Sequence, residues 1–133
     1  MSDEDVRWKQ RFQNFQKSLN YLEDALDIIE PDIIQKAGII QFFEMTFELA
    51  WHTMKDYLEG QGFLNLNSPR DAIKKAFEIE LITGGHLWLK ALEDRNLTSH
   101  TYDEETAAEV ENLIRINYYP LLRDFSNIMI LKT

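Results

Sequence analysis

The residues of this chain best suited to chemistry lie close together, between Arg95 and Tyr102. Arg95 carries a permanent positive charge that suits a phosphate group, and the imidazole of His100 can exchange a proton near neutral pH. In a continuous α-helix, residues five apart point about 140° away from each other, so these two side chains can meet only if a helix ends between them. Thr98 and Ser99 are mediocre helix formers and favour such an end.

Three sequence blocks resemble the nucleotidyltransferase substrate-binding protein family. They are residues 88–102 (WLKALEDRNLTSHTY), 47–58 (FELAWHTMKDYL) and 68–73 (SPRDAI), and their order and spacing match over about residues 8–125. Members of this family are small helical partners of minimal nucleotidyltransferases and belong to the wider HEPN group. The resemblance therefore implies a helical fold and a nucleotidyltransferase partner.

The resemblance also implies a ribonuclease site, because HEPN ribonucleases carry an R-x4-H pattern like that of Arg95 and His100. In the implied metal-independent mechanism, the imidazole takes the proton of a ribose 2′-hydroxyl and the guanidinium stabilises charge on the phosphate. Such sites typically form between two copies of the domain. Asn96, Ser99 and Glu44 are expected to bind substrate or support the site. In the alternative interpretation, Arg95 pairs with a carboxylate of the bundle and His100 caps a helix end.

Tyr102 extends the pattern to R-x4-H-x-Y. In some HEPN toxins that tyrosine is adenylylated by the partner nucleotidyltransferase, which switches the ribonuclease off. A bulky anionic group beside Arg95 would fill the phosphate site. Alternatively, Tyr102 simply packs at the start of a helix.

Glu44 interrupts the apolar face of a predicted helix, where a charge needs a partner. Arg95 is the first candidate for that partner, and Arg7 and Arg11 are others. Alternatively, Glu44 flanks the apolar face and reaches solvent.

Two long stretches each show apolar residues at every third or fourth position, which predicts a helix with one buried face. The first stretch carries Trp8, Phe12, Phe15, Leu19, Leu22, Leu26 and Ile29. The second carries Ile33, Ile40, Phe47, Trp51, Met54 and Leu58. Pro31 is expected to end the first helix and Asp32 to cap the second, which stops at Gly60 or Gly62.

Two shorter helices are predicted next. Ser68 and Pro69 give a start signal, as cap and first helical residue, for a helix that ends near Leu81. Thr83 is expected to cap the following helix, which runs to about Leu97.

A last helix is predicted from Asp103, which serves as its cap, with a kink at Pro120. Its apolar face carries Ala107, Val110, Ile114, Leu121, Phe125 and Ile128. Together these elements predict an all-α fold, an antiparallel four-helix bundle with one additional short helix, in a single domain over residues 1–133.

The formal net charge is −9, which argues against strong non-specific binding to nucleic acid, so RNA would need a local basic patch. There is no cysteine, and no apolar run is long enough to span a bilayer. Residues 1–5 (MSDED) do not resemble a signal peptide, so we expect a cytoplasmic protein with no membrane partner.

The chain carries no Gly-Ser followed by an Asp-x-Asp pair, the metal-binding signature of nucleotidyltransferases. It is therefore not expected to transfer nucleotides alone, and ATP or another NTP with magnesium is expected on the partner. Glu48 and His52 are one turn apart and could pair, but this spacing predicts no metal site, and no cofactor is expected in this chain.

Two functions follow from these observations. The favoured hypothesis is a substrate-binding subunit of a two-component nucleotidyltransferase, and the alternative is a ribonuclease toxin neutralised by that nucleotidyltransferase as antitoxin. The many aromatic residues, together with the typical behaviour of the family, predict a homodimer with a two-fold axis.

Overall fold

The computed structural model describes residues 3–95 and 103–133 of the chain. They fold into α1 (Asp3–Leu26), α2 (Ile33–Gly60), α3 (Pro69–Glu78), α4 (Gly85–Arg95), α5 (Glu104–Leu113), the π-helical turn η2 (Ile114–Tyr118) and α6 (Tyr119–Ile130). No strand occurs within these two ranges, and the all-α prediction is confirmed.

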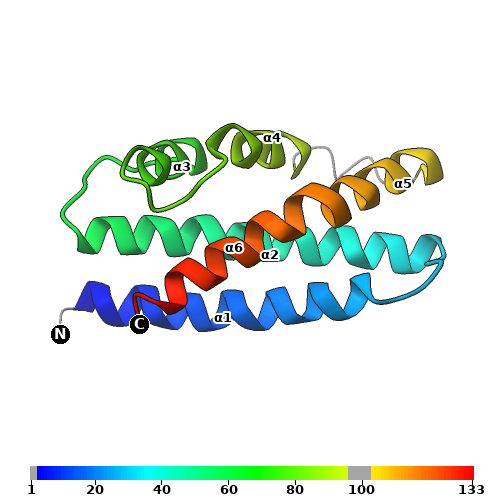
Figure 1. Cartoon of the computed structure of the whole chain (residues 1–133), viewed down its shortest axis with the longest axis horizontal. Coiled ribbons are helices and arrows are strands. Elements are labelled where there is room, and N and C mark those ends of the chain that lie inside the picture. The colour runs from blue at the N-terminus through cyan, green and yellow to red at the C-terminus, as the bar shows by residue number, and fades with distance from the viewer. Residues whose placement is uncertain (1–2, 96–102) are drawn as a thin grey trace.

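The helix α2 is the central element, because it contacts each of the other α-helices. α1 and α2 run antiparallel along the length of the molecule, and α3 and α4 lie next to each other on one side of α2 (Figure 1). The stretch formed by α5, η2 and α6 crosses the α1–α2 pair obliquely and brings the C-terminus near the start of α1 (Figure 1). No helix of the described ranges is both long and apolar enough to cross a membrane.

The predicted caps are present at three helix starts. The carboxylate of Asp32 accepts the backbone N–H of Gln35 at 2.8 Å, and the Gln35 side chain accepts the N–H of Asp32 in return. The hydroxyl of Ser68 accepts a backbone N–H in the first turn of α3, and Asp103 does the same in α5. These bonds satisfy N–H groups that have no partner inside the helix, so short-range chemistry fixes where each helix begins.

The first helix ends earlier than predicted. α1 stops at Leu26, and Ile29 is 89% exposed, so its place on the buried face was wrong. The terminal carbonyl of Leu26 accepts a hydrogen bond from the guanidinium of Arg115 at 2.6 Å. This contact spans 89 residues and was not accessible to local pattern analysis.

The α3–α4 connection also differs from the prediction. Glu80 has a φ of 62°, which ends α3 at Glu78 instead of Leu81. Thr83 is not the cap of α4, because the Gly84 carbonyl accepts the first N–H groups there. Gly84 has a φ of 65°, a conformation that glycine adopts without strain. The predicted end of α4 at Leu97 lies outside the described residues.

The core consists mainly of aromatic and large aliphatic side chains. Trp8 and Trp51 are buried, as predicted, and so is Trp88. Phe125 packs edge-on against Trp88 and Phe15, with ring centroids 5.7 and 5.5 Å apart. Such edge-to-face contacts hold α1, α4 and α6 at fixed positions around α2.

The predicted irregularity near Pro120 takes the form of η2, which ends at Tyr118, two residues before the proline. Proline has no N–H to donate to the preceding turn, and a π-helical turn is one way for a helix to absorb such a break. Ile114 and Tyr118 of this turn are buried, while Ile116 is exposed.

Candidate functional site

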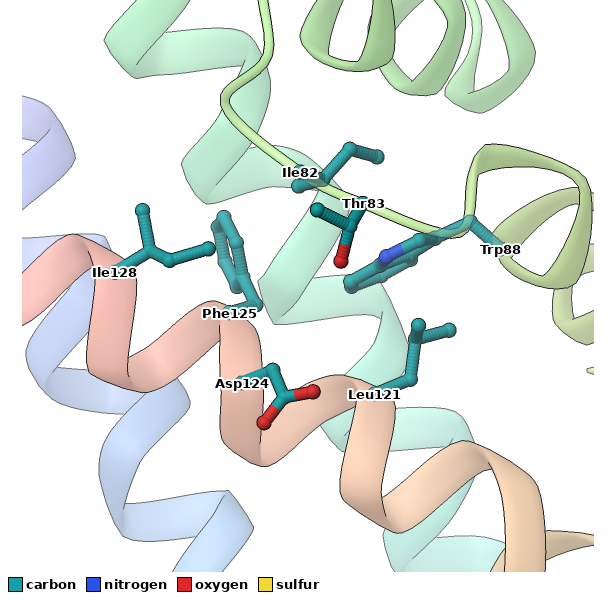
Figure 2. Close-up of a pocket in the computed structure, with 7 residues that line it drawn as sticks. All are labelled: Ile82, Thr83, Trp88, Leu121, Asp124, Phe125 and Ile128. Carbon is teal, nitrogen blue, oxygen red and sulfur yellow. The ribbon is translucent and has the colours of Figure 1, made fainter.

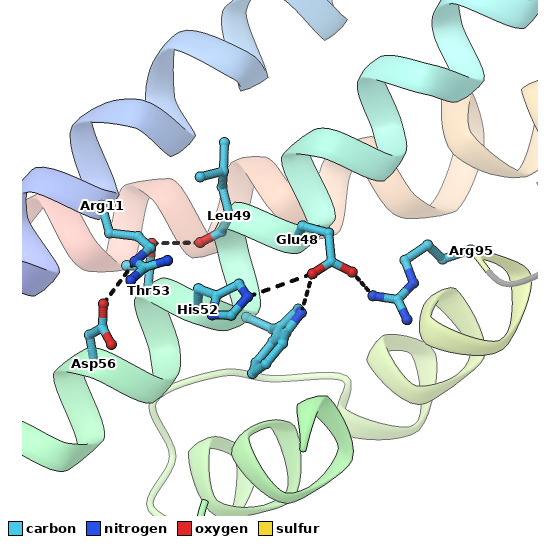
Figure 3. A network of polar contacts seen from close by, with 8 residues as sticks. Arg11, Glu48, Leu49, His52, Thr53, Asp56 and Arg95 are labelled. Carbon is cyan, nitrogen blue, oxygen red and sulfur yellow. Dashed lines mark hydrogen bonds and ion pairs between the residues drawn. The ribbon is translucent and has the colours of Figure 1, made fainter. Parts of the chain in front are cut away.

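Arg95 is the last residue of α4, and its side chain reaches across to α2. Its guanidinium forms an ion pair with Glu48 (Figure 3) and lies over the ring of Phe47, 5.8 Å from the ring centre. Only 18% of the Arg95 side chain is exposed. The alternative prediction, that Arg95 pairs with a carboxylate of the bundle, is therefore confirmed, and the pair holds the charged group in one place.

Glu48 holds three neighbours at once (Figure 3). One carboxylate oxygen pairs with Arg95. The other accepts the indole N–H of Trp51 at 2.9 Å and lies 3.7 Å from Nε2 of His52. Glu48 and His52 are therefore neighbours, as predicted. The Glu48 carboxylate also links the guanidinium of Arg95 to the indole of Trp51.

Two opposing effects act on the pKa of the Arg95 guanidinium, and the net result is a lowered pKa. Burial lowers its pKa, and the negative charge of Glu44 acts in the opposite direction and raises it. An arginine remains protonated under such shifts, so Arg95 is a cation at neutral pH. Glu44 lies one turn before Glu48 and is half-buried, so it both flanks the apolar face and acts on Arg95.

His52 is a second imidazole in this cluster. Its ring stacks on Trp51, with ring centres 3.8 Å apart. Its pKa is lowered mainly by burial and further by the positive charge of Arg11, against an opposing effect of Asp56. Because the ordinary pKa of histidine is about 6.5, the ring is neutral at pH 7.

Asp94 anchors the last turn of α4 to a neighbouring element. The phenol of Tyr118, in η2, donates a hydrogen bond to its carboxylate, and Nζ of Lys90 lies 3.3 Å from the other oxygen. Burial, and then this hydrogen bond, raise the pKa of Tyr118 well above its usual range. Asp94 is 3% exposed, so the backbone next to Arg95 is tied to the π-helical turn.

A separate ion pair lies further along α2 (Figure 3). Nε of Arg11, in α1, lies 2.8 Å from the carboxylate of the buried Asp56. Arg11, one of the candidate partners of Glu44, is thus engaged by Asp56.

The small cleft between α4 and α6 is not a substrate site (Figure 2). Trp88, Leu121, Asp124 and Phe125 are among its lining residues, and its volume is about 10 Å³, room for about one water molecule. No group of three or more histidine and carboxylate side chains within residues 3–95 and 103–133 is arranged to hold a metal ion.

Comparison with known proteins decides the family. The model of the family described as nucleotidyltransferase substrate binding protein like matches residues 10–130. The chain belongs to this family. This member of the nucleotidyltransferase substrate-binding protein family is similar to the "Probable ribonuclease HepT" of Haemophilus influenzae. The two sequences are 36% identical over 90 residues. That match covers 62% of this chain and 61% of the relative, so the chain spans less than two thirds of the relative's length.

A solved structure shares the fold of this family member. It is a crystal structure of a protein from Thermus thermophilus, 30% identical, with a TM-score of 0.71. The similarity covers 86% of this chain and 92% of that one.

Of the residues predicted for the site, Arg95 and Glu44 lie in the described part of the chain, where they act on each other electrostatically. Asn96, Ser99, His100 and Tyr102 lie outside the described residues, and their roles remain predictions.

Three residues of the site were not foreseen in their roles. Glu48 was paired with His52 but not with Arg95. The partners Asp94 and Tyr118 are 24 positions apart and on different helices, so no short-range spacing relates them. The only available signal for Glu48 was its place one turn after Glu44 on the same helix face.

Proposed function

We propose that this protein is a metal-independent HEPN-type ribonuclease that works with a separately encoded minimal nucleotidyltransferase. The observation that carries the proposal is the half-buried, charged Arg95 held at the end of α4 by Glu48. The R-x4-H pattern that starts at this arginine and the name of the Haemophilus influenzae relative, a probable ribonuclease, support it.

In the proposed reaction, the guanidinium of Arg95 contacts the scissile phosphodiester, and His100 removes the proton of the adjacent ribose 2′-hydroxyl. The 2′-oxygen attacks phosphorus, and the bond to the 5′-oxygen of the next nucleotide breaks. That oxygen leaves with a proton taken from water, which gives a 2′,3′-cyclic phosphate and a 5′-hydroxyl, and His100 releases its proton to solvent. Arg95 stabilises the additional negative charge on the phosphate in the transition state.

The phosphate must either displace the Glu48 carboxylate from Arg95 or share the guanidinium of Arg95 with it. Glu48 is 43% exposed, so it can turn into solvent when an anion takes its place. Trp51 and the neutral His52 remain beside the vacated position as hydrogen-bonding groups.

We propose a nucleotidyltransferase partner that binds ATP or another NTP with magnesium and adenylylates Tyr102. The two proteins would then form a toxin–antitoxin pair in the cytoplasm, with the helical protein as a homodimer. The added phosphate would compete with RNA for Arg95, which explains how the modification silences the enzyme. Light scattering should give the mass of a dimer at micromolar concentration, and the mass of a monomer would contradict this part.

The hollows on the described surface favour a polymer over a small acceptor molecule. Those of about 340 to 640 Å³ are open to solvent, and the cleft between α4 and α6 holds only about 10 Å³. Small substrates are usually bound in clefts that bury most of their surface, whereas RNA can lie along an open one.

The proposal is tested by incubating the purified protein with RNA in the presence of EDTA. We expect cleavage by the wild type and none by His100→Ala or Arg95→Ala, with the helical signal and melting temperature of both nearly unchanged. Adding the partner, ATP and magnesium should add the mass of an adenylyl group at Tyr102 and stop cleavage. Unchanged cleavage by Arg95→Ala would refute the proposal.

The second candidate is a substrate-binding subunit of a two-component nucleotidyltransferase, which the family description favours. It predicts no intrinsic cleavage. Instead, Arg95→Ala should weaken capture of the acceptor by the two-protein complex, measured as a rise in KM of nucleotidyl transfer.

A further inference from the structure

Arg95 lines an open hollow that also receives a second arginine. The hollow, here called the α3–α4 hollow, has a volume of about 370 Å³. It is lined by Ser68, Pro69 and Arg70 at the start of α3 and by Leu92, Glu93 and Arg95 at the end of α4. Both helices lie on the same side of α2, so the two guanidinium groups come from separate elements that are packed together (Figure 1).

Arg70 has a different electrostatic environment from Arg95. Its residue is exposed, and none of the ion pairs of the described ranges includes it. Arg95 is already paired with Glu48, so Arg70 supplies the uncompensated positive charge of the hollow.

Helix stability does not explain the position of Arg70. It follows Pro69 in the first turn of α3, where the positive end of the helix dipole disfavours a cation and favours an acid such as Asp71. A residue that breaks a local rule without a structural gain is a candidate for function.

We infer that Arg70 binds the RNA backbone, at a phosphodiester next to the one held by Arg95. A guanidinium suits this ligand, because its planar donors match two phosphate oxygens. Arg95 lines the hollow but is paired with Glu48, so Arg70 is the guanidinium of the hollow that no ion pair of the described ranges engages. Arg70 is a positioning residue, and its role rests on the proposed function, in which Arg95 binds the scissile phosphate.

The test measures binding of a fluorescein-labelled 2′-O-methyl oligonucleotide, which lacks the hydroxyl needed for cleavage, by anisotropy at several salt concentrations. Loss of one phosphate contact should lower the slope of log affinity against log salt by about 0.7 for a single strand, or about fivefold in affinity at 0.1 M salt. We expect this for Arg70→Ala, together with a similar rise in KM for unmodified RNA and little change in kcat. Arg70→Lys should keep the salt slope.

Lys74→Ala is the matched control. Lys74 is an exposed cation one turn further along α3 and does not line the hollow. Its removal should leave affinity and slope unchanged. Equal effects of Arg70→Ala and Lys74→Ala, or no binding by the wild type, would overturn the inference.

The inference and the proposed function can fail separately. If the wild type cleaves RNA and Arg70→Ala binds as well as the wild type, the ribonuclease stands and the role of Arg70 does not. If Arg70 governs binding of the 2′-O-methyl strand while unmodified RNA stays intact, the backbone site stands and the ribonuclease does not.

Discussion

Two arginine–carboxylate pairs each join α2 to a neighbouring helix. In one pair the acid is the more buried partner, and in the other the arginine is. In the Arg11–Asp56 pair, the acid is 7% exposed and the arginine 34% exposed. In the Arg95–Glu48 pair, the arginine is 18% exposed and the acid 43% exposed. In the first pair, Arg11 compensates the charge of the buried Asp56. In the second pair, the accessible Glu48 compensates the charge of the half-buried Arg95. Only the second arrangement allows the anion to be exchanged for another one, such as a phosphate.

The largest effect on stability is expected from Arg11→Ala. It leaves the carboxylate of Asp56 buried without its partner, which should lower the free energy of unfolding by about 3 kcal/mol. Urea denaturation measures this directly. Asp56→Asn in the Arg11→Ala background is the control and should restore part of the loss. If Arg11→Ala lowers the unfolding free energy by less than Arg95→Ala does, the Arg11–Asp56 pair is not the more structural of the two.

The second-largest effect on stability is expected from Tyr118→Phe, which removes the phenol that donates a hydrogen bond to Asp94. A buried carboxylate that loses a hydrogen bond should cost about 2 kcal/mol in unfolding free energy. Tyr21→Phe, at a tyrosine that is 59% exposed, is the control for loss of a hydroxyl. If both variants cost the same, Tyr118 has no special part in holding α4.

The same tyrosine should make stability depend on pH. Below pH 10 the phenol is protonated in both the folded and unfolded states, and its contribution is complete. Because the folded pKa is raised, only the unfolded chain loses the proton as pH rises above 10. The unfolding free energy should therefore fall by up to about 1.4 kcal/mol per pH unit. The stability gap between wild type and Tyr118→Phe should narrow from pH 9 to pH 11, and a constant gap would contradict the shift.

Arg95→Ala should cost about 1 kcal/mol or less in unfolding free energy, because the exposed Glu48 can be hydrated once its partner is gone. RNA cleavage should nevertheless be lost. A cost near 3 kcal/mol, about that of stranding a buried charge, would show that Arg95 is a structural residue like Arg11, and both proposed functions would lose their main support.

The smallest effect on stability is expected from Glu48→Gln. The amide oxygen can still accept from Trp51, so the unfolding free energy should change by a few tenths of a kcal/mol. RNA affinity should rise slightly, because a carboxylate that competes with phosphate for Arg95 has been neutralised. Anisotropy with the 2′-O-methyl strand measures it, and a loss of binding would show that Glu48 orients Arg95 more than it competes.

Three helix starts could be predicted from the sequence because they depend on short-range side-chain caps, whereas the start predicted from Thr83 was wrong because a glycine carbonyl takes that place in α4. Asp32, Ser68 and Asp103 each bond to an N–H within three residues, and such bonds leave a readable pattern. The end of α1 could not be predicted, because its last carbonyl is satisfied by Arg115, which is distant in sequence.

The site was predictable to a similar extent. The family blocks identified Arg95, but which carboxylate pairs with it depends on how α4 lies against α2. Glu44 and Glu48 are one turn apart on the same helix face, and only the packing of the two helices places Glu48 in the ion pair. Asp94 and Tyr118 meet because η2 turns the phenol towards α4, which no local pattern specifies.

The π-helical turn η2 also determines how this part of the chain responds to changes in length. Removing one residue between Glu104 and Tyr118 would let α-helical hydrogen bonds continue, and it would rotate the preceding helix by about 100° relative to α6. Ala107 and Val110 would then leave the core together, and Asp103 would shift with them. A substitution along this stretch changes one side chain only. Deletion of a single residue changes which side of the helix every preceding residue lies on. Length is thus the more tightly constrained property of residues 104–118.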